Sequence, residues 1–279
     1  MEIVTTRDAR EFDRVAGPFL AQRLQTNVPA GILINILDGR FAAGRPVFAY
    51  GLGDRGGLRF AALRTPPWPL LCSELDGAGA EALLDSWLRE DPGLPGVSAL
   101  PATARTIAAA WRRRRPGTVR LRRSEAMHAL ERVHHLPRPA AGELRVARAA
   151  DRPLLLDWTS DFMLEAGVAS AAQAEAMIDS RLERGGMLVW EDGRPVAMVG
   201  VTPPVSGVVR IGPVFTPLRW RRRGYAGTAV AAASRRSLAQ GASRCLLFTD
   251  LANPTANKIY AEIGYRRFAD WEELVFDPD

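Results

Sequence analysis

The second half of the chain shows a clear succession of apolar and mixed segments. Residues 208–215 (VVRIGPVF) form an apolar run of strand length. An Ala-rich segment of helical composition follows at 228–240, and residues 244–249 predict the next strand. A short Asn-containing segment then ends near Gly264. The pattern predicts a strand, a turn, a helix, a strand and a short helix, in that order.

Other segments of this half complete the predicted sheet. The runs 187–191 and 195–202 predict a hairpin, because Asp192-Gly193 suits its tight turn. Two helices are predicted before the hairpin, the first carrying an apolar face and the second spanning residues 171–184. The remaining predicted strands are 144–149, 265–268 and 272–276, of which the last two are expected to close the sheet of this half.

The first half repeats this order of elements without repeating its residues. Its predicted helices lie at 7–24, 32–37, 78–88 and 102–115, and its predicted strands at 46–52, 58–63, 69–72, 97–100, 119–122 and 127–133. This similarity of order favours an internal duplication, although an unrelated α/β domain stays open. We expect domains at 1–136 and 144–279, joined by a Pro-containing linker at 137–143.

The turn before residue 228 has the composition of an anion site. The first N–H groups of a helix are unpaired and, with the helix dipole, attract phosphate oxygens. Gly224, Ala226 and Gly227 keep side chains small there, and the run 221–223 adds three arginines. The spacing fits neither a Walker loop nor a dinucleotide fingerprint. The alternative is an arginine-flanked turn that opens an ordinary helix.

Two motifs in this stretch resemble those of the GNAT N-acetyltransferases. Arg221, Gly224 and Ala226 match the family's (Gln/Arg)-x-x-Gly-x-(Gly/Ala) signature, and residues 253–260 resemble its Asn-containing segment that ends in tyrosine. The resemblance covers about residues 144–276. It implies a GNAT fold, an α/β (α+β) class with a mixed, mostly antiparallel sheet flanked by helices, in two tandem GNAT-like domains. It implies that acetyl-CoA is the co-substrate.

The resemblance also implies which residues bind the coenzyme. The strand before the turn would splay from its neighbour and hold the pantetheine arm, while the turn would hold the diphosphate. The residues expected to bind acetyl-CoA are Val214, Phe215, Thr216, Arg221, Arg222, Arg223, Gly224, Tyr225, Ala226, Gly227, Thr228, Asn253 and Asn257. In the first half, the corresponding segment carries Glu74, Asp76 and Glu81, which would repel a diphosphate. That half is therefore expected to be a degenerate domain.

Acyl transfer to an amine needs an oxyanion donor, a proton for the leaving sulfur and a deprotonated amine. A backbone N–H near Val214 would serve the oxyanion, and Tyr260 would supply the proton, unless it is only a packed core tyrosine. Many family members place a glutamate on the strand before the turn, but here that strand carries Arg210 and no acid. The remaining candidates for the base are Glu191, Asp192, Asp157, Asp161, Glu165 and solvent.

The composition of the chain bears on its cellular compartment and on the kinds of partner that it binds. The net charge is +6, but only Lys258 among 37 basic residues is lysine, a bias typical of GC-rich coding rather than of a nucleic-acid patch. No apolar stretch has the length of a membrane span or secretory signal. Cys72 and Cys245 lie in apolar runs, which predicts buried thiols and no metal site. We expect a cytoplasmic monomer or homodimer that binds neither nucleic acid nor membrane.

These observations favour an acyltransferase of class EC 2.3.1.- that moves an acetyl group from acetyl-CoA to a primary amine of a small molecule by direct attack. A non-catalytic acyl-CoA sensor or scaffold is one alternative. A protein N-terminal or lysine acetyltransferase is the other.

Overall fold

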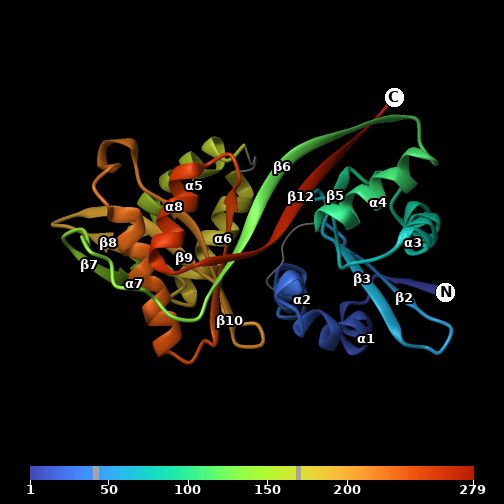
Figure 1. The fold of residues 1–279 in the computed structure, drawn as a ribbon, viewed down its shortest axis with the longest axis horizontal. Coiled ribbons are helices and arrows are strands. Elements are labelled where there is room, and N and C mark those ends of the chain that lie inside the picture. Colours follow the sequence, from blue (N-terminus) through green and yellow to red (C-terminus); the bar gives the residue numbers. More distant parts are fainter. Residues whose placement is uncertain (40–43, 168–170) are drawn as a thin grey trace. The chain divides into compact units, whose positions relative to one another are not determined.

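A computed structural model describes residues 1–39, 44–167 and 171–279 (Figure 1). The chain divides into two compact units. Unit 1 comprises Met1–Met127, Asp250–Ala252 and Ala269–Asp279, and unit 2 comprises His128–Thr249 and Asn253–Phe268. Unit 1 therefore takes residues from both ends of this chain. The predicted domain boundaries at 1–136, 137–143 and 144–279 stay a prediction.

Unit 1 has a mixed sheet covered by helices. The strand order is β1-β2-β3-β4-β5-β12, in which β4 and β5 are parallel and the other pairs are antiparallel. Its elements are β1 (Glu2–Thr6), α1 (Ala9–Ala21), η1 (Leu24–Thr26), α2 (Asn27–Leu37), β2 (Val47–Leu52), β3 (Leu58–Arg64), β4 (Leu70–Cys72), α3 (Gly77–Glu90), β5 (Gly96–Ala99), α4 (Pro101–Arg112), most of β6 (Gly117–Leu130) and most of β12 (Arg266–Pro278).

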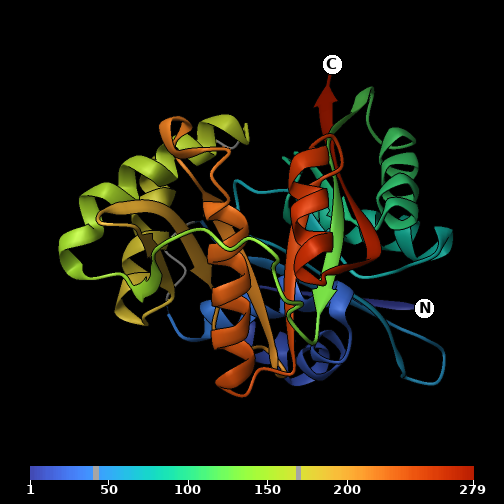
Figure 2. The ribbon, with the colours of Figure 1, turned by 60° about the vertical axis from the view of Figure 1, so that its left-hand side comes forward.

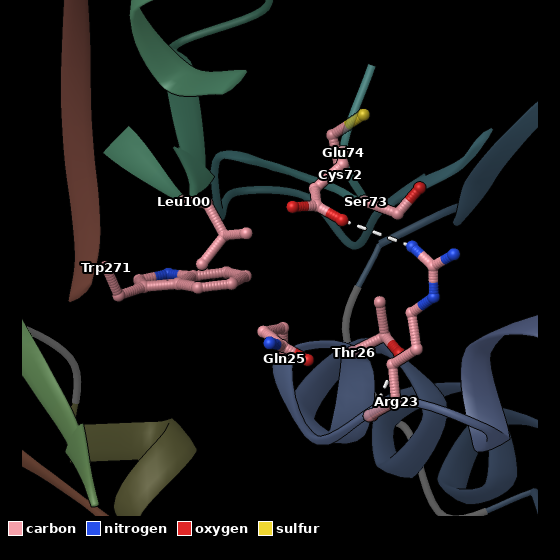
Figure 3. Close-up of a pocket in the computed structure, with 8 residues that line it drawn as sticks. All are labelled: Arg23, Gln25, Thr26, Cys72, Ser73, Glu74, Leu100 and Trp271. Carbon is pink, nitrogen blue, oxygen red and sulfur yellow. Dashed lines mark hydrogen bonds and ion pairs between the residues drawn. The ribbon is translucent and has the colours of Figure 1, made fainter. Parts of the chain in front are cut away.

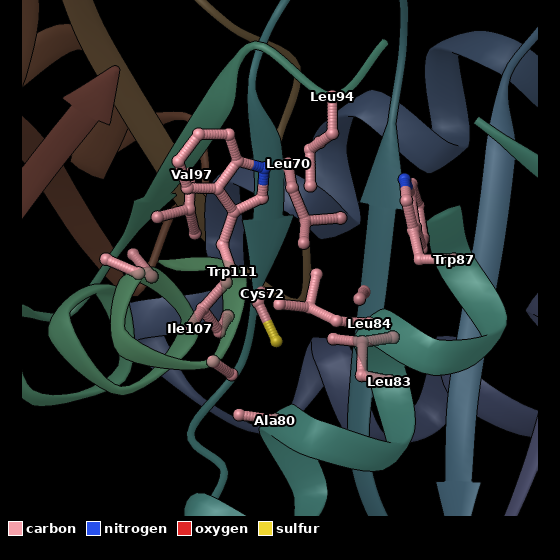
Figure 4. Close-up of a cluster of buried hydrophobic side chains, with 14 of the residues drawn as sticks. Leu70, Cys72, Ala80, Leu83, Leu84, Trp87, Leu94, Val97, Ile107 and Trp111 are labelled. Atoms are coloured by element: carbon pink, nitrogen blue, oxygen red, sulfur yellow. The ribbon is translucent and has the colours of Figure 1, made fainter. Parts of the chain in front are cut away.

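The core of unit 1 forms where α3 and α4 pack on the sheet (Figure 4). In α3, the buried residues Ala80, Leu83, Leu84 and Trp87 follow the i, i+3, i+4, i+7 spacing of one helix face. Asp76 caps this helix, since its Oδ1 accepts a hydrogen bond from Gly79 N at 2.7 Å. Local capping and periodicity therefore both specify this helix.

Both thiols are expected to resist modification in the folded protein. Cys72 lies in the core of unit 1, and Cys245 lies in unit 2 with its Sγ 3.8 Å from Ser234 O. Burial raises the pKa of both, that of Cys245 to about 11, so almost no thiolate exists at neutral pH. Ellman's reagent should release no colour from native protein and two equivalents after denaturation. Rapid native reaction would contradict this burial.

Unit 2 has a sheet in the order β11-β10-β9-β8-β7. The β10–β11 pair is parallel, and the other pairs are antiparallel. Its elements are β7 (Glu143–Val146), η2 (Ala149–Asp151), α5 (Arg152–Glu165), α6 (Ala171–Glu183), β8 (Met187–Glu191), β9 (Pro195–Val201), β10 (Val208–Phe215), η3 (Leu218–Trp220), α7 (Tyr225–Ala239), β11 (Arg244–Asp250) and α8 (Pro254–Ile263). Figure 2 shows α7 and α8 from a second direction.

The two faces of the unit 2 sheet carry different helices. Leu188 and Trp190 of β8 pack in one cluster with α7, while Met187 and Val189 pack in another with α5 and α6. This is the alternation expected of a strand with both faces covered. Unit 2 therefore has helices on each side of β8 to β10.

The structure confirms the predicted class, a mixed, mostly antiparallel sheet flanked by helices. The predicted hairpin is present as β8 and β9. Three details differ. Residues 119–122 and 127–133, predicted as two strands, belong mainly to the single strand β6, and β1 was not predicted. The prediction that 272–276 closes the sheet of the second half is wrong, because these residues pair with β5.

Within the described chain, no helix combines the length and the apolar character needed to cross a bilayer.

Candidate functional site

The strands β10 and β11 run side by side for only a short distance. Their parallel pairing joins Val208–Arg210 to Arg244–Leu246. The other edge of β10 pairs with β9, with an irregularity between Ile211 and Val214. Beyond Arg210, the β11-facing backbone groups of β10 lie outside this ladder. Val214 and Phe215 at the end of β10, and Thr216 directly after it, therefore lie outside the ladder with β11, and we call the space beside this part of the chain the strand gap.

The turn that follows β10 leads into α7, whose N-terminus has no side-chain cap. Arg222 and Gly224 have positive φ, 63° and 82°, which brings the chain sharply into α7. The first hydrogen bond of α7 runs from Thr228 N to Gly224 O at 3.0 Å. Glycine has no side chain to cap the helix, so the N–H groups of residues 225–227 have no partner within it. These donors and the helix dipole form a site suited to phosphate oxygens.

The arginines of the turn have different surroundings. Arg221 donates two hydrogen bonds to Glu165, at 2.6 and 2.8 Å, and one from Nε to Thr216 O at 2.7 Å. Its guanidinium therefore ties the end of β10 to the end of α5. Arg222 and Arg223 are exposed, and Arg223 lies over the Trp220 ring at 5.1 Å. They are the accessible cations beside the helix terminus.

Two other predicted residues make structural hydrogen bonds. Thr228 Oγ1 accepts a hydrogen bond from Ala140 N at 2.9 Å, so part of the predicted linker lies against the start of α7. Tyr225 donates its hydroxyl proton to Asp192 Oδ2 at 2.5 Å, and this bond raises the pKa of Tyr225. Both side chains hold the turn and helix in place.

The end of β10 contains one polar atom that lacks a partner. Phe215 packs against Trp158, and Val214 packs against the cluster under α7. Thr216 is buried, and among the described residues its Oγ1 has no hydrogen-bond partner. Such a group is uncommon in native proteins, and a ligand that reaches the strand gap could satisfy it.

The short helix α8 carries the remaining predicted residues. Asn253 caps it, accepting a hydrogen bond from Ala256 N at 3.0 Å. Asn257 bonds to Asn253 O at 2.9 Å and accepts a hydrogen bond from Thr249 at 2.5 Å. The Thr249 contact links α8 to β11, the strand on the far side of the gap.

Tyr260 lies on α8 with its ring edge-on to Tyr265, at a centroid distance of 6.0 Å. Burial raises the pKa of Tyr260 to about 12. The phenol therefore keeps its proton at about pH 10, where an amine of ordinary pKa is already partly deprotonated. A protonated phenol near the gap suits the role of an acid.

Most candidate bases are already engaged. Glu191 pairs with Arg145, Asp192 accepts from Tyr225, and Glu165 pairs with Arg221. Asp157 and Asp161 are exposed on α5. Strand β10 itself carries no carboxylate. The geometry of the described residues therefore identifies no base.

The corresponding region of unit 1 differs in charge. There, β4 and β5 pair through Leu70–Val97 and Leu71–Ser98, and a pocket lies beyond (Figure 3). Trp271 lines this pocket and donates its indole proton to Ser98 at 2.7 Å. The segment before α3 brings carboxylates, since Asp76 caps the helix and Glu74 pairs with Arg23 at 3.1 Å. The uncapped helix terminus of unit 2 has no counterpart here.

The sequence model of the acetyltransferase (GNAT) family matches residues 152–265. Residues 152–265 are a GNAT acetyltransferase domain. This match includes α5, β10, the basic turn, α7 and α8, and therefore the residues predicted to bind acetyl-CoA and Tyr260. No curated protein matches the chain significantly in sequence.

Solved structures resemble the whole chain in fold. A GNAT-family acetyltransferase from Colwellia psychrerythraea has a TM-score of 0.65 at 11% identity, with 100% of both chains covered. A GCN5-related N-acetyltransferase from Kribbella flavida has a TM-score of 0.61 at 17% identity, over 92% of this chain and 97% of that one. A tandem GNAT protein from the clavulanic acid biosynthesis pathway has a TM-score of 0.60 at 12% identity, over 99% and 98%. These similarities show that the GNAT fold extends beyond the matched GNAT domain.

Sequence reasoning missed several contacts in this region. It did not foresee the Arg221–Glu165 pair, the packing of Ala140 on Thr228 or the arginines around Trp220. The acidic residues four apart on α5 indicated a negative stripe but not which cation would pair with it. The sequence contained no signal for the second, since a linker's contacts depend on the folded surface it meets.

Proposed function

We propose that this protein is an acetyl-CoA-dependent N-acetyltransferase acting on a primary amine of a small molecule. The observation that supports this proposal best is the uncapped start of α7, which follows β10 where that strand is no longer paired with β11. The match to the acetyltransferase (GNAT) family supports acyl transfer, with acetyl as the transferred group. The relative from the clavulanic acid pathway supports a small-molecule acceptor.

Different residues would bind the coenzyme, stabilise the oxyanion and supply the proton. The N–H groups of Tyr225, Ala226 and Gly227, with Arg222 and Arg223, would bind the diphosphate, and the gap beside Val214 would take the pantetheine. The amine, after losing its ammonium proton to water, forms a C–N bond with the acyl carbon while a β10 N–H stabilises the oxyanion. The C–S bond then breaks, the sulfur takes the proton of Tyr260, and the phenolate recovers a proton from the nitrogen.

The coenzyme site is tested by calorimetric titration of acetyl-CoA into the wild type and Ala226→Glu. Ala226 is in the first turn of α7, where a carboxylate suits the helix dipole but repels a diphosphate. We expect the variant to fold normally and its Kd to rise about 100-fold or more.

The matched control is Ala102→Glu, which places the same charge in the first turn of α4 in unit 1. It should bind acetyl-CoA as the wild type does. Unchanged binding by Ala226→Glu would place the diphosphate elsewhere. A wild type that binds no acetyl-CoA would overturn the proposed function.

A further inference from the structure

Two arginines, Arg181 and Arg210, lie close together on the α6 side of unit 2, and Arg184 follows Arg181 in the chain. Arg181 is in α6, Arg184 follows its end, and Arg210 is in β10. Val209 and Ile211 pack toward α7, so the intervening Arg210 points to the α6 face. Arg210 is close enough to Arg181 that, after burial, its charge is the second cause lowering the Arg181 pKa to about 9. At neutral pH the Arg181 guanidinium therefore still carries its charge.

The backbone of β9 and β10 is shaped to admit Arg181. Its Nη1 donates to Gly212 O at 2.6 Å. A Cβ at Gly200 would lie 2.1 Å from the same Nη1 and 2.7 Å from Gly212 O. The guanidinium therefore lies directly over bare backbone, where any larger residue would displace it.

This cluster lacks the counter-charge that neighbouring arginines have. In the same unit, Arg145, Arg152 and Arg221 each pair with a carboxylate. Among the described residues, by contrast, none of Arg181, Arg184 and Arg210 forms an ion pair. Arg184 Nη2 is also buried without a hydrogen-bond partner there. Withdrawing an unpaired cation from water is unfavourable, and a bound anion could offset that cost.

The cluster lies beside the strand on which transfer is proposed. Gly212, which Arg181 contacts, is two residues before Val214, or about 7 Å along the strand. An acceptor of that length could reach both places. We propose that Arg181 and Arg210, supported by Arg184, bind an oxyanion of the acceptor, so that the substrate is a primary amine that also carries a carboxylate or a phosphate.

This inference rests on the proposed function, and matched acceptors test it. Amino acids would be compared with their carboxamides, and phosphoethanolamine with ethanolamine, at saturating acetyl-CoA. The wild type should prefer the anionic member of each pair. Arg210→Gln should raise its KM for anionic acceptors about 10- to 100-fold, the effect of losing a charged hydrogen bond, without changing KM for neutral amines. The preferred anion distinguishes carboxylate from phosphate.

The control is Arg236→Gln, the same change at an exposed residue near the other end of α7, which should behave as wild type. Equal or better use of neutral amines by the wild type would overturn the inference. So would an Arg210→Gln variant whose KM rises equally for both members of a pair. A wild type that binds no acetyl-CoA would instead overturn the proposed function.

A binding measurement decides the question without turnover. With CoA filling the coenzyme site and ionic strength held constant, succinate or phosphate should raise the Tm of the wild type and Arg236→Gln. It should not raise the Tm of Arg210→Gln. Equal shifts in all three proteins, or none in the wild type, would leave the arginines with a structural role only.

Discussion

Tyr260→Phe is expected to lower kcat about 10²- to 10⁴-fold, the usual contribution of a positioned acid. The phenylalanine ring preserves the edge-on contact with Tyr265 and removes only the hydroxyl. The Kd for acetyl-CoA, measured by calorimetry, should therefore stay within about twofold of wild type. Release of free CoA, followed with a thiol reagent, measures kcat.

The control is Tyr265→Phe. The Tyr265 hydroxyl bonds to Ser234 Oγ at 2.8 Å inside the core, so its loss should reduce stability by about 1 kcal/mol and spare kcat. If Tyr260→Phe retains wild-type kcat, Tyr260 is a packing residue and the acid is another group.

The raised pKa of Tyr260 also determines the pH profile. A phenol donates only below its pKa, and burial moves that limit from the usual 10 to about 12. The wild-type rate should therefore rise as the amine deprotonates and show no alkaline fall through pH 10.

The largest effect on folding is expected from removing β12 from the rest of unit 1. The fragment 1–136 lacks Trp271, Leu274 and Phe276, which are buried in the full chain, and Phe276 stacks on Trp111 at 4.7 Å. Emptying such positions costs about 2–5 kcal/mol each, so their joint loss approaches or exceeds the whole stability of a domain. The fragment should show no cooperative melting transition by circular dichroism.

Adding a peptide of residues 266–279 should restore the transition, because it supplies the antiparallel partner of β5. The same peptide with serine at the three buried positions should not. Cooperative melting of 1–136 alone would show that β12 is dispensable to this unit.

The sequence predicted local structure well where a short-range signal existed. The hairpin of β8 and β9 followed from its alternation and Asp-Gly turn, and the α7 turn followed from glycine spacing. The predicted helix at 228–240 in fact begins at Tyr225, since Gly224 in a left-handed conformation directs the chain into the helix earlier. Patterns of this kind are decided within a few residues.

Long-range partners had no such signal. The segment 272–276 was correctly expected to be a strand, but its pairing with β5 depends on which sheet edge is open after folding. The arginines at 112–115 lie at the end of the helix predicted at 102–115, but no local pattern predicted that Arg113 and Arg114 bind Glu81 or that Arg114 also binds Asp85 on α3. Likewise, the sequence showed that the strand before the turn carries Arg210 where many family members have a glutamate. Only the folded structure showed that Arg181 lies close to Arg210.

The composition of unit 1 also bears on how the protein is made. Ribosomes add about 5–20 residues per second, and a domain normally folds as soon as its sequence has emerged. Unit 1 cannot do so, because Ala269–Asp279 is translated after all of unit 2. Until then the edge of β5 that pairs with β12 has no partner, and unpaired edges of this kind make folding intermediates prone to aggregate. We therefore expect unit 2, which contains the GNAT domain, to be complete on the ribosome before unit 1.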